Sequence, residues 1–239
     1  MLQLSKRMQA VADLAGKADV LADVGTDHAY IPVYLAECGK LKKAIAMDIN
    51  RGPLMRAREH IQQYAVEDYI ETRLSDGLDA LEPGEADTIV IAGMGGALMT
   101  RILDRGETVA RRAKRLVLQP QSELLAFRCF LSEHGYQIVA EDMVYEEQKF
   151  YTIMAAEPIQ VDQKVSGCFL SQTELKYGPL LIQKRHPVLK LYLQRQQKQK
   201  QEILERLNVN AKCDISKRKC QVEQELAEIA EVLELWKEQ

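Results

Sequence analysis

The sequence lacks an apolar run long enough to cross a membrane. None of its 239 residues falls in a stretch approaching the roughly 18 to 20 consecutive apolar residues that a membrane span requires. The first residues, MLQLSKRMQAVADLAG, interrupt their apolar positions with charges and so lack the continuous apolar core of a signal peptide. Both absences predict a protein that is not associated with a membrane and resides in the cytoplasm.

Cysteine is scarce, and the spacing of the cysteines does not indicate disulfide bonds. The five cysteines are odd in number and never form a C-x-x-C pair: Cys38, Cys129, Cys168, Cys213 and Cys220. This pattern disfavours both a disulfide framework and a structural zinc site. We therefore expect no metal, and the pattern fits a reducing compartment.

The chain also lacks the excess of basic charge that is typical of nucleic-acid-binding proteins. It has 32 Lys and Arg against 35 Asp and Glu, a net charge of −3. The deficit is uneven, because residues 159–239 carry 14 basic against 11 acidic residues, and residues 184–200 contain six basic residues and no acid. This asymmetry hints at an anionic partner for the C-terminal part, although a solvated helix face explains the basic run nearly as well.

Short apolar runs alternate with helical patterns through residues 1–158. We expect strands at 20–25, 44–49, 69–75, 87–93 and 115–119, helices at 4–15, 29–39, 53–64, 96–105 and 122–134, and a closing antiparallel pair over 136–158. Alternating strands and helices form right-handed crossovers. The pattern therefore predicts an α/β fold, with a mainly parallel sheet covered by helices on both faces.

The character of the sequence changes after Pro158. Apolar residues of the last segment recur with the steps of a heptad seam: Ile215, Val222, Leu226, Ile229, Leu233 and Trp236. The candidate partner helix is 184–208, where Gln196 and Lys200 place polar side chains in the middle of the seam. We expect a first domain over 1–158 and a helical appendage over 159–239, an antiparallel coiled-coil hairpin with about 25 residues per arm.

Polar residues and glycines follow four successive predicted strands. The segments are Asp23-Val24-Gly25-Thr26-Asp27-His28, Asp48-Ile49-Asn50, Ser75-Asp76-Gly77 and Gly93-Met94-Gly95-Gly96. In open parallel sheets, ligands bind in the crevice outside the carboxyl ends of the strands. We therefore expect the four segments to line one site.

The residue types in these segments favour a ligand without phosphates. The first loop lacks the G-x-G-x-x-G fingerprint of dinucleotide-binding proteins, and its two carboxylates repel phosphate and attract a cationic group. Asp48 is placed to accept from both hydroxyls of a ribose, and Asp76 to accept from the exocyclic amine of an adenine. S-adenosylmethionine, which joins an adenosyl group to an amine and a sulfonium, satisfies all these features. The predicted cofactor-binding residues are Asp23, Gly25, Thr26, Asp48, Ile49, Asp76, Gly77, Gly93 and Gly95.

Each of these residues also has a purely structural explanation. Asp23 and Gly25 suit an ordinary strand-to-helix turn, and Asp48 and Asp76 suit caps. The Gly93–Gly96 segment suits close packing of the following helix. The four segments together, in this order, favour the cofactor site.

Five strings resemble one protein family. ADVGTDHAYIP (22–32), AMDIN (46–50), RLSDGL (73–78), IAGMGG (91–96) and LQPQ (118–121) are similar to the bacterial tRNA (adenine-22-N1)-methyltransferases, and the resemblance covers the whole chain. It implies a Rossmann-like class I methyltransferase domain with a C-terminal coiled-coil appendage. It also implies S-adenosylmethionine as methyl donor and N1 of adenine 22 in tRNA as acceptor.

The reaction does not require a nucleophile from the protein, because adenine N1 has its own lone pair. A carboxylate near the adenine amino group would stabilise the positive charge that develops on the base, and Asp27 is the candidate. His28 and Tyr30 are expected to shape the mouth of the pocket, where an aromatic ring can stack on an extruded base. Gln119 and Gln121 are expected to read the base edge, and Met94 to lie beside the reacting centre. The alternative is that His28 starts a helix and Tyr30 packs between helix and sheet.

Two other functions remain open from the sequence. The first is a methyltransferase for a small molecule or another RNA, with the hairpin serving as a dimerisation arm. The second is a protein that binds S-adenosylmethionine or RNA without catalysis. For the tRNA enzyme we expect a monomer.

Overall fold

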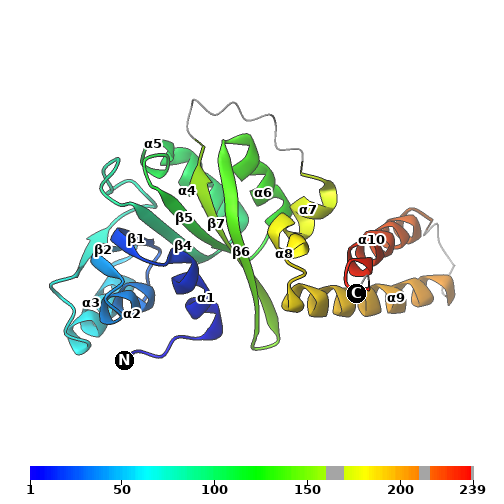
Figure 1. Ribbon diagram of the computed structural model, residues 1–239, viewed down its shortest axis with the longest axis horizontal. Coiled ribbons are helices and arrows are strands. Elements are labelled where there is room, and N and C mark those ends of the chain that lie inside the picture. The colour runs from blue at the N-terminus through cyan, green and yellow to red at the C-terminus, as the bar shows by residue number, and fades with distance from the viewer. Residues whose placement is uncertain (160–169, 210–215, 238–239) are drawn as a thin grey trace. The chain divides into compact units, whose positions relative to one another are not determined.

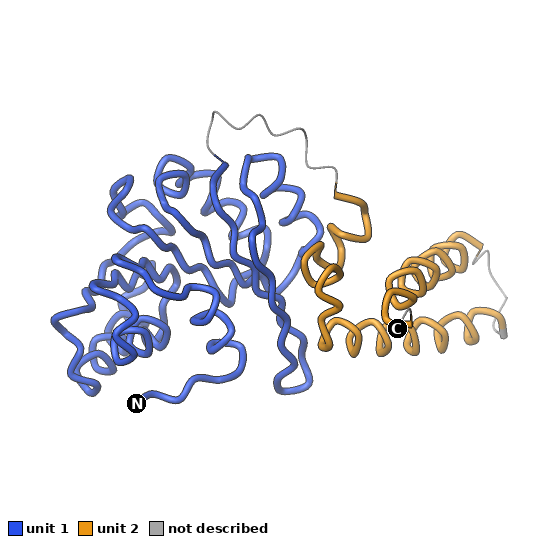
Figure 2. The backbone as a smooth tube through the Cα atoms, in the orientation of Figure 1, with its two compact units in different colours: residues 1–169 blue, residues 170–239 orange. Residues whose placement is uncertain are grey.

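The computed structural model describes residues 1–159, 170–209 and 216–237. The chain divides into two compact units, Met1–Phe169 and Leu170–Gln239 (Figure 2). Most of the linker expected after Pro158, and Ile215 of the predicted seam, lie outside the described residues. In the described part of the chain, no helix is both long enough and apolar enough to span a membrane.

The first unit contains a seven-stranded sheet in the order β3-β2-β1-β4-β5-β7-β6 (Figure 1). Its strands are β1 (Ala18–Val24), β2 (Leu41–Asp48), β3 (Ile70–Leu74), β4 (Thr88–Met94), β5 (Arg115–Pro120), β6 (Tyr136–Glu146) and β7 (Lys149–Pro158). The first five strands are parallel, and β7 runs antiparallel to both β5 and β6. β1 and β4 are adjacent and the connections leave them in opposite directions, so the segments that follow these two strands lie side by side at this point.

Six helices cover the two faces of this sheet. They are α1 (Lys6–Ala15), α2 (Tyr30–Glu37), α3 (Arg51–Gln63), α4 (Gly96–Arg105), α5 (Glu107–Ala110) and α6 (Leu124–Glu133). Alternate residues of one strand enter opposite cores: Leu21 packs with the apolar faces of α1–α3, whereas Ala22 and Val24 pack with those of α4–α6. The period-2 alternation of a strand thus holds helices on both faces.

The expected α/β fold with a mainly parallel sheet is confirmed, with small differences at two helices. The helix expected from Ser122 begins at Leu124, because Glu123 adopts a left-handed backbone with φ of 57°. The four-residue helix α5 was not predicted, since one turn is too short to show a periodic pattern.

The second unit contains α7 (Gln172–Tyr177), α8 (Pro179–Gln183), α9 (Pro187–Val209) and α10 (Ser216–Glu234). The last two helices pack together, as the heptad pattern predicts, and bury Val222 and Ile229. Lys200 forms an ion pair with Glu225 of α10, so the polar middle of the seam is matched by a polar partner.

The first arm of the hairpin is shorter than the expected 184–208. Arg185 has φ of 50° and ends α8, so α9 starts two residues later at Pro187, a residue that suits the first turn of a helix. The indole N–H of Trp236 donates to the backbone oxygen of Arg185 at 3.1 Å. This hydrogen bond joins the region after α10 to the start of the hairpin.

Candidate active site

A pocket of about 260 Å³ lies at the carboxyl ends of β1 and β4. It is lined by Asp23, by the loop from Gly25 to Ile31, by Ala92, Gly93 and Gln121, and by Arg7, Met8 and Val11 of α1. The structure thus brings the predicted residues of the first segment together with Gly93 of the fourth in one cavity, whereas Met94 and Gly95 are not in its lining. Asp48 and Asp76 lie on neighbouring strand ends outside this cavity's lining.

The loop after β1 is tied closely to the next strand. The N–H groups of Gly25 and Thr26 both donate to the backbone oxygen of Met47, at 2.8 and 2.9 Å. The Thr26 hydroxyl oxygen is buried and accepts from the Ala29 N–H at 3.1 Å. Thr26 therefore builds the loop, and through the loop it positions the side chains of Asp27 and His28.

Asp23 is the buried acid of the pocket. Burial raises the pKa of its carboxyl to about 6, and a hydrogen bond with the Thr26 side chain offsets part of this rise. A carboxylate removed from water without a positive partner is destabilised. The site consequently favours a bound cationic group beside Asp23.

Close backbone packing joins the first and fourth segments. Gly25 has φ of 77°, and a Cβ built on it would lie 2.0 Å from the terminal methyl carbon of Met94. Gly93 also has a positive φ, 80°, at the point where the β4–β5 register shifts. A side chain at Gly25 would collide with Met94, and one at Gly93 would approach the pocket-lining residues Arg7 and Gln121. Gly95 follows as the N-cap of α4.

The end of β2 carries Asp48 and Ile49. One carboxylate oxygen of Asp48 accepts from the backbone N–H of Asn50 at 2.6 Å, which fixes the direction of the side chain. Its other oxygen is left for a ligand. Ile49 is 57% exposed, so an apolar side chain lies open to solvent next to this carboxylate.

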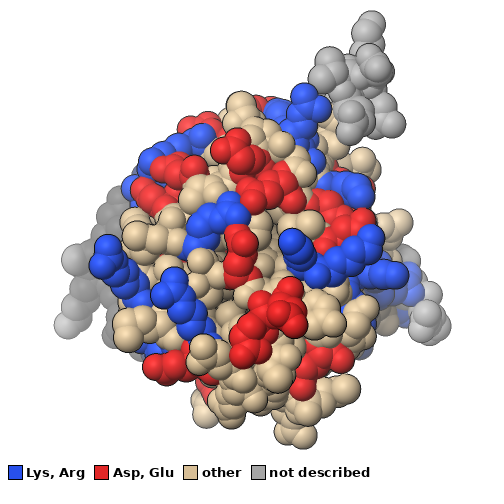
Figure 3. Space-filling model, turned by 90° about the vertical axis from the view of Figure 1, so that its left-hand side faces the viewer, with Lys and Arg blue, Asp and Glu red and all other residues tan. Residues whose placement is uncertain are grey.

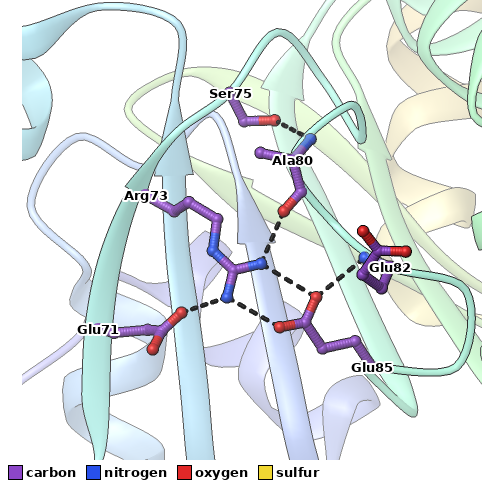
Figure 4. A network of polar contacts seen from close by, with 6 residues as sticks. All are labelled: Glu71, Arg73, Ser75, Ala80, Glu82 and Glu85. Carbon is purple, nitrogen blue, oxygen red and sulfur yellow. Dashed lines mark hydrogen bonds and ion pairs between the residues drawn. The ribbon is translucent and has the colours of Figure 1, made fainter.

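A guanidinium clamp holds the loop after β3 (Figure 4). Arg73 donates to both carboxylate oxygens of Glu85, at 3.0 and 2.8 Å, and to the backbone oxygen of Ala80 at 2.6 Å. It also pairs with Glu71. The hydrogen bond from Arg73 lowers the pKa of the Glu85 carboxyl, so the clamp remains charged at neutral pH.

The clamped loop carries Asp76 and Gly77. Within it, the Ser75 hydroxyl donates to the Gly77 backbone oxygen at 2.9 Å. The hydrogen bond from Arg73 to Ala80 holds the same loop against β3. Asp76 is 54% exposed and pairs with Arg105 at 2.8 Å, and the same guanidinium also pairs with Asp79. A ligand amine at Asp76 would share the carboxylate with Arg105.

Asp27, His28 and Tyr30 line the pocket. One oxygen of the exposed Asp27 carboxylate accepts from Arg56 Nε at 2.7 Å, and the other lies 3.7 Å from His28 Nε2. The rings of His28 and Tyr30 stack with centroids 5.1 Å apart. His60 completes the group, since its Nδ1 donates to the His28 backbone oxygen at 2.8 Å.

Gln119 does not lie where the sequence analysis expected it to act. Its side chain is fully buried, and its amide oxygen accepts from the Gly93 N–H at 3.1 Å and from Arg7 Nη1 at 3.0 Å. The amide oxygen therefore connects two residues of the pocket lining, and the buried side chain is not accessible to a base. Its neighbour Gln121 lines the pocket instead.

Three basic or titratable residues of the site were missed by the sequence analysis: Arg7, Arg56 and His60. They come from helices α1 and α3, whereas the four segments that predict the site follow strands. Arg7 could have been found from the sequence, because it is a basic residue on the otherwise apolar face of the first helix. Within the described residues, no cluster of His, Cys, Asp and Glu could hold a metal ion.

Comparison with known proteins identifies the family. The model of the tRNA (adenine(22)-N(1))-methyltransferase family matches residues 21–236. The chain belongs to this family. It is 37% identical to the tRNA (adenine(22)-N(1))-methyltransferase of Bacillus subtilis (strain 168), over 99% of this chain and 97% of that protein.

Solved structures agree with the family assignment. Streptococcus pneumoniae Sp1610 in complex with S-adenosyl-L-methionine is similar with a TM-score of 0.82 and 34% identity, over 97% of this chain and 100% of that one. The crystal structure of the B. subtilis enzyme gives 0.73 and 32%, over 100% and 99%. Both similarities extend over 97% or more of this chain.

The residues of this chain fit the methyl donor. Asp23 is a buried carboxylate that lacks a positive partner among the described residues, and Gly93 leaves space in the pocket lining that a side chain would enter. Asp48 has a carboxylate oxygen left for a hydroxyl donor. S-adenosylmethionine is therefore the cofactor that the chemistry of this donor set matches.

Proposed function

We propose that this chain uses the pocket at the ends of β1 and β4 to transfer a methyl group from S-adenosylmethionine to N1 of adenine 22 in tRNA. Family membership gives the reaction. One observation supports its assignment to this pocket: a buried carboxylate, the open Gly93 backbone and the Asp27–His28–Tyr30 mouth all line the same cavity. When bound, the cofactor supplies an electrophilic methyl group on a sulfonium.

The cofactor is held by the strand ends in this proposal. Asp23 accepts from the α-ammonium, and Asp48 accepts from the ribose hydroxyls beside Ile49. Asp76 accepts from the adenine amine, with Gly77 and the Arg73 clamp fixing its loop. Gly25, Thr26, Gly93 and Gly95 shape the backbone around the ligand.

Asp27 acts on the acceptor base. Arg56 orients its carboxylate and leaves one oxygen for the adenine amino group, which becomes more acidic as positive charge develops on the ring. His28 and Tyr30 offer stacked rings to the extruded base, and Met94 packs against Gly25 beside the reacting centre. Alignment of N1 with the methyl carbon supplies much of the rate.

The helical hairpin holds the body of the tRNA in this proposal. The face shown in Figure 3, which carries α2 and α3, mixes basic and acidic side chains. By contrast, residues 184–200 carry basic residues without acids. Because α9 and α10 already bury Val222 and Ile229 within one chain, we expect a monomer, and we place the reaction in the cytoplasm.

The test measures single-turnover methyl transfer to unmodified tRNA and to free adenosine, with the wild type and Asp27→Asn. We expect transfer to tRNA alone, a lower rate at saturating substrates for the variant, and an unchanged affinity for S-adenosylhomocysteine. Glu59→Gln, an exposed acid on α3, is the matched control. Transfer to adenosine at the same rate would favour a small-molecule enzyme, and cofactor binding without any transfer would favour a binding protein.

A further inference from the structure

Two rings from the end of α3 lie next to the pair formed by His28 and Tyr30. His60 and Tyr64 are on successive turns, and their ring centroids are 4.8 Å from each other. The His60 ring also meets the Tyr30 ring edge-on, with centroids 4.9 Å apart and 74° between the ring planes. Such edge-to-face contacts are favourable between aromatic rings. His60 therefore joins Tyr30, which lines the pocket, to the end of α3.

The peptide between His28 and Ala29 is held at both of its polar groups. His60 Nδ1 donates to the His28 backbone oxygen at 2.8 Å, and because a carbonyl oxygen only accepts, Nδ1 carries the proton. The Ala29 N–H of the same peptide donates to the Thr26 hydroxyl oxygen at 3.1 Å. One side chain from α3 and one from the loop thus fix the orientation of this peptide.

Ala29 has a backbone conformation that is unfavourable for alanine. Its φ of 51° and ψ of 33° lie in the left-handed region, which disfavours residues with a Cβ, and its side chain is fully buried. Such a conformation persists only where surrounding contacts impose it. The two hydrogen bonds to the preceding peptide are contacts of this kind. The turn they hold places the rings of His28 and Tyr30 in a stack, with centroids 5.1 Å apart.

His60 acts on the pocket only through its neighbours. His28, Ala29 and Tyr30 are among the described residues that line the cavity of about 260 Å³, and His60 is not. The Nδ1 proton of His60 is used by the His28 oxygen, and its ring packs on two tyrosines. A substitution of His60 therefore changes the shape of the lining without removing a group from it.

We propose that His60 is a positioning residue, which sets the stacked rings of His28 and Tyr30 for the extruded base of the RNA. This inference rests on the proposed function. The hydrogen bond from His60 maintains the left-handed turn at Ala29, and the His60 ring limits the orientation of Tyr30. The base that enters the pocket thus meets a stacking surface that is already formed.

Two substitutions separate the hydrogen bond from the ring. His60→Phe keeps a ring beside Tyr30 and removes the donor to His28, whereas His60→Asn keeps an N–H donor and removes the ring. His134→Phe is the matched control. His134 Nδ1 also contacts a backbone oxygen, that of Phe130 at 2.9 Å, and its ring packs on the Phe130 ring at 4.0 Å. It follows α6, near the amino ends of the parallel strands and away from the pocket.

Three measurements are made on each protein, and urea unfolding checks that the fold is retained. Single-turnover methyl transfer at saturating tRNA and S-adenosylmethionine gives the rate constant of the reaction. Calorimetry gives the affinity for S-adenosylhomocysteine. Amide hydrogen exchange of Ala29 in the free protein reports how often the turn opens.

We expect His60→Phe to lower the rate constant about 10- to 100-fold through misalignment of the base, with an affinity for S-adenosylhomocysteine within about twofold of the wild type. The Ala29 N–H should exchange about 2- to 10-fold faster in this variant, the range for the loss of one hydrogen bond. His60→Asn should recover part of both losses. His134→Phe should match the wild type in all three measurements.

Three results would overturn this role of His60. A wild-type rate constant in His60→Phe would show that the stacked rings do not depend on His60. Equal losses of rate and of affinity for S-adenosylhomocysteine would mean that His60 supports cofactor binding. Equal losses in His60→Phe and His60→Asn, with unchanged exchange of Ala29, would mean that His60 fills space and does not hold the turn.

The same experiment separates this role from the proposed function. A wild-type protein that transfers no methyl group to tRNA would contradict the proposed function, and the role of His60 with it. Methyl transfer by the wild type that is unchanged in His60→Phe would contradict the role of His60 alone.

Discussion

The buried carboxylate of Asp23 predicts that the stability of the free protein falls as the pH rises. Its pKa is about 6 in the folded chain against 3.8 as the ordinary value, because burial disfavours the charged form. Between these two values the native state binds more protons than the unfolded state. The stabilisation from the protonated form is therefore complete below about pH 3.8 and is lost as the pH rises through about 6.

The magnitude follows from the shift. About two pKa units correspond to about 3 kcal/mol at 1.36 kcal/mol per unit, and the group is fully buried, so little is lost to solvent screening. Of this, about 1 kcal/mol falls between pH 5 and pH 7.5, where the unfolded carboxyl is already ionised. Asp23→Asn removes the titrating group and with it this part of the pH dependence.

The assay is urea unfolding of the wild type and Asp23→Asn at several values between pH 5 and pH 7.5. As the pH rises over this range, the free energy of unfolding of the wild type should fall by about 1 kcal/mol relative to that of the variant. Saturating S-adenosylhomocysteine should remove this trend in the wild type, since its ammonium stabilises the ionised carboxylate. Parallel pH profiles for the two free proteins would refute the reasoning.

Three further predictions concern other parts of the molecule. Asp48→Ala should weaken S-adenosylhomocysteine binding about 10- to 100-fold by calorimetry, since charged hydrogen bonds to the ribose are lost; an unchanged affinity would contradict the ribose assignment. Arg128→Met should lower the free energy of unfolding by about 3–5 kcal/mol, because it leaves the buried Glu141 without its ion-pair partner, and adding Glu141→Leu should recover most of the loss. A single variant as stable as wild type would show that the pair is dispensable. Replacing the exposed Lys184 and Lys198 together by Gln should weaken tRNA binding and reduce the slope of log affinity against log salt by about two. An unchanged slope would remove the hairpin from the tRNA interface.

The sheet and the helices around the site could be predicted because local patterns of apolar and turn residues indicate them. Apolar runs such as 87–93 are bounded by turn residues, and α4 begins and ends where its glycine and arginine indicate. The heptad steps likewise predicted that α9 and α10 pack together. These signals depend on residues that are near each other in the sequence.

The parts that escaped prediction depend on residues far apart in the chain. The position of Gln119 at a strand end predicted an amide that reads the base. In the structure its amide oxygen is hydrogen-bonded to Arg7, which lies 112 residues away in the sequence. Lys200 is a polar residue in the middle of an apolar seam, and the sequence did not indicate that Glu225, 25 residues later, is its ion-pair partner. Neither partnership leaves a periodic trace in the sequence.

The most direct test of the proposed reaction is the position of the methyl group on the RNA. Unmodified tRNA is incubated with the protein and labelled S-adenosylmethionine, and nucleoside and fragment mass spectrometry locates the product. A matched tRNA with adenine 22 replaced by guanine is the control. The account predicts 1-methyladenosine at position 22 of the first tRNA and no methylation of the second. Equal methylation of both RNAs, or a methyl group on another atom, would contradict it.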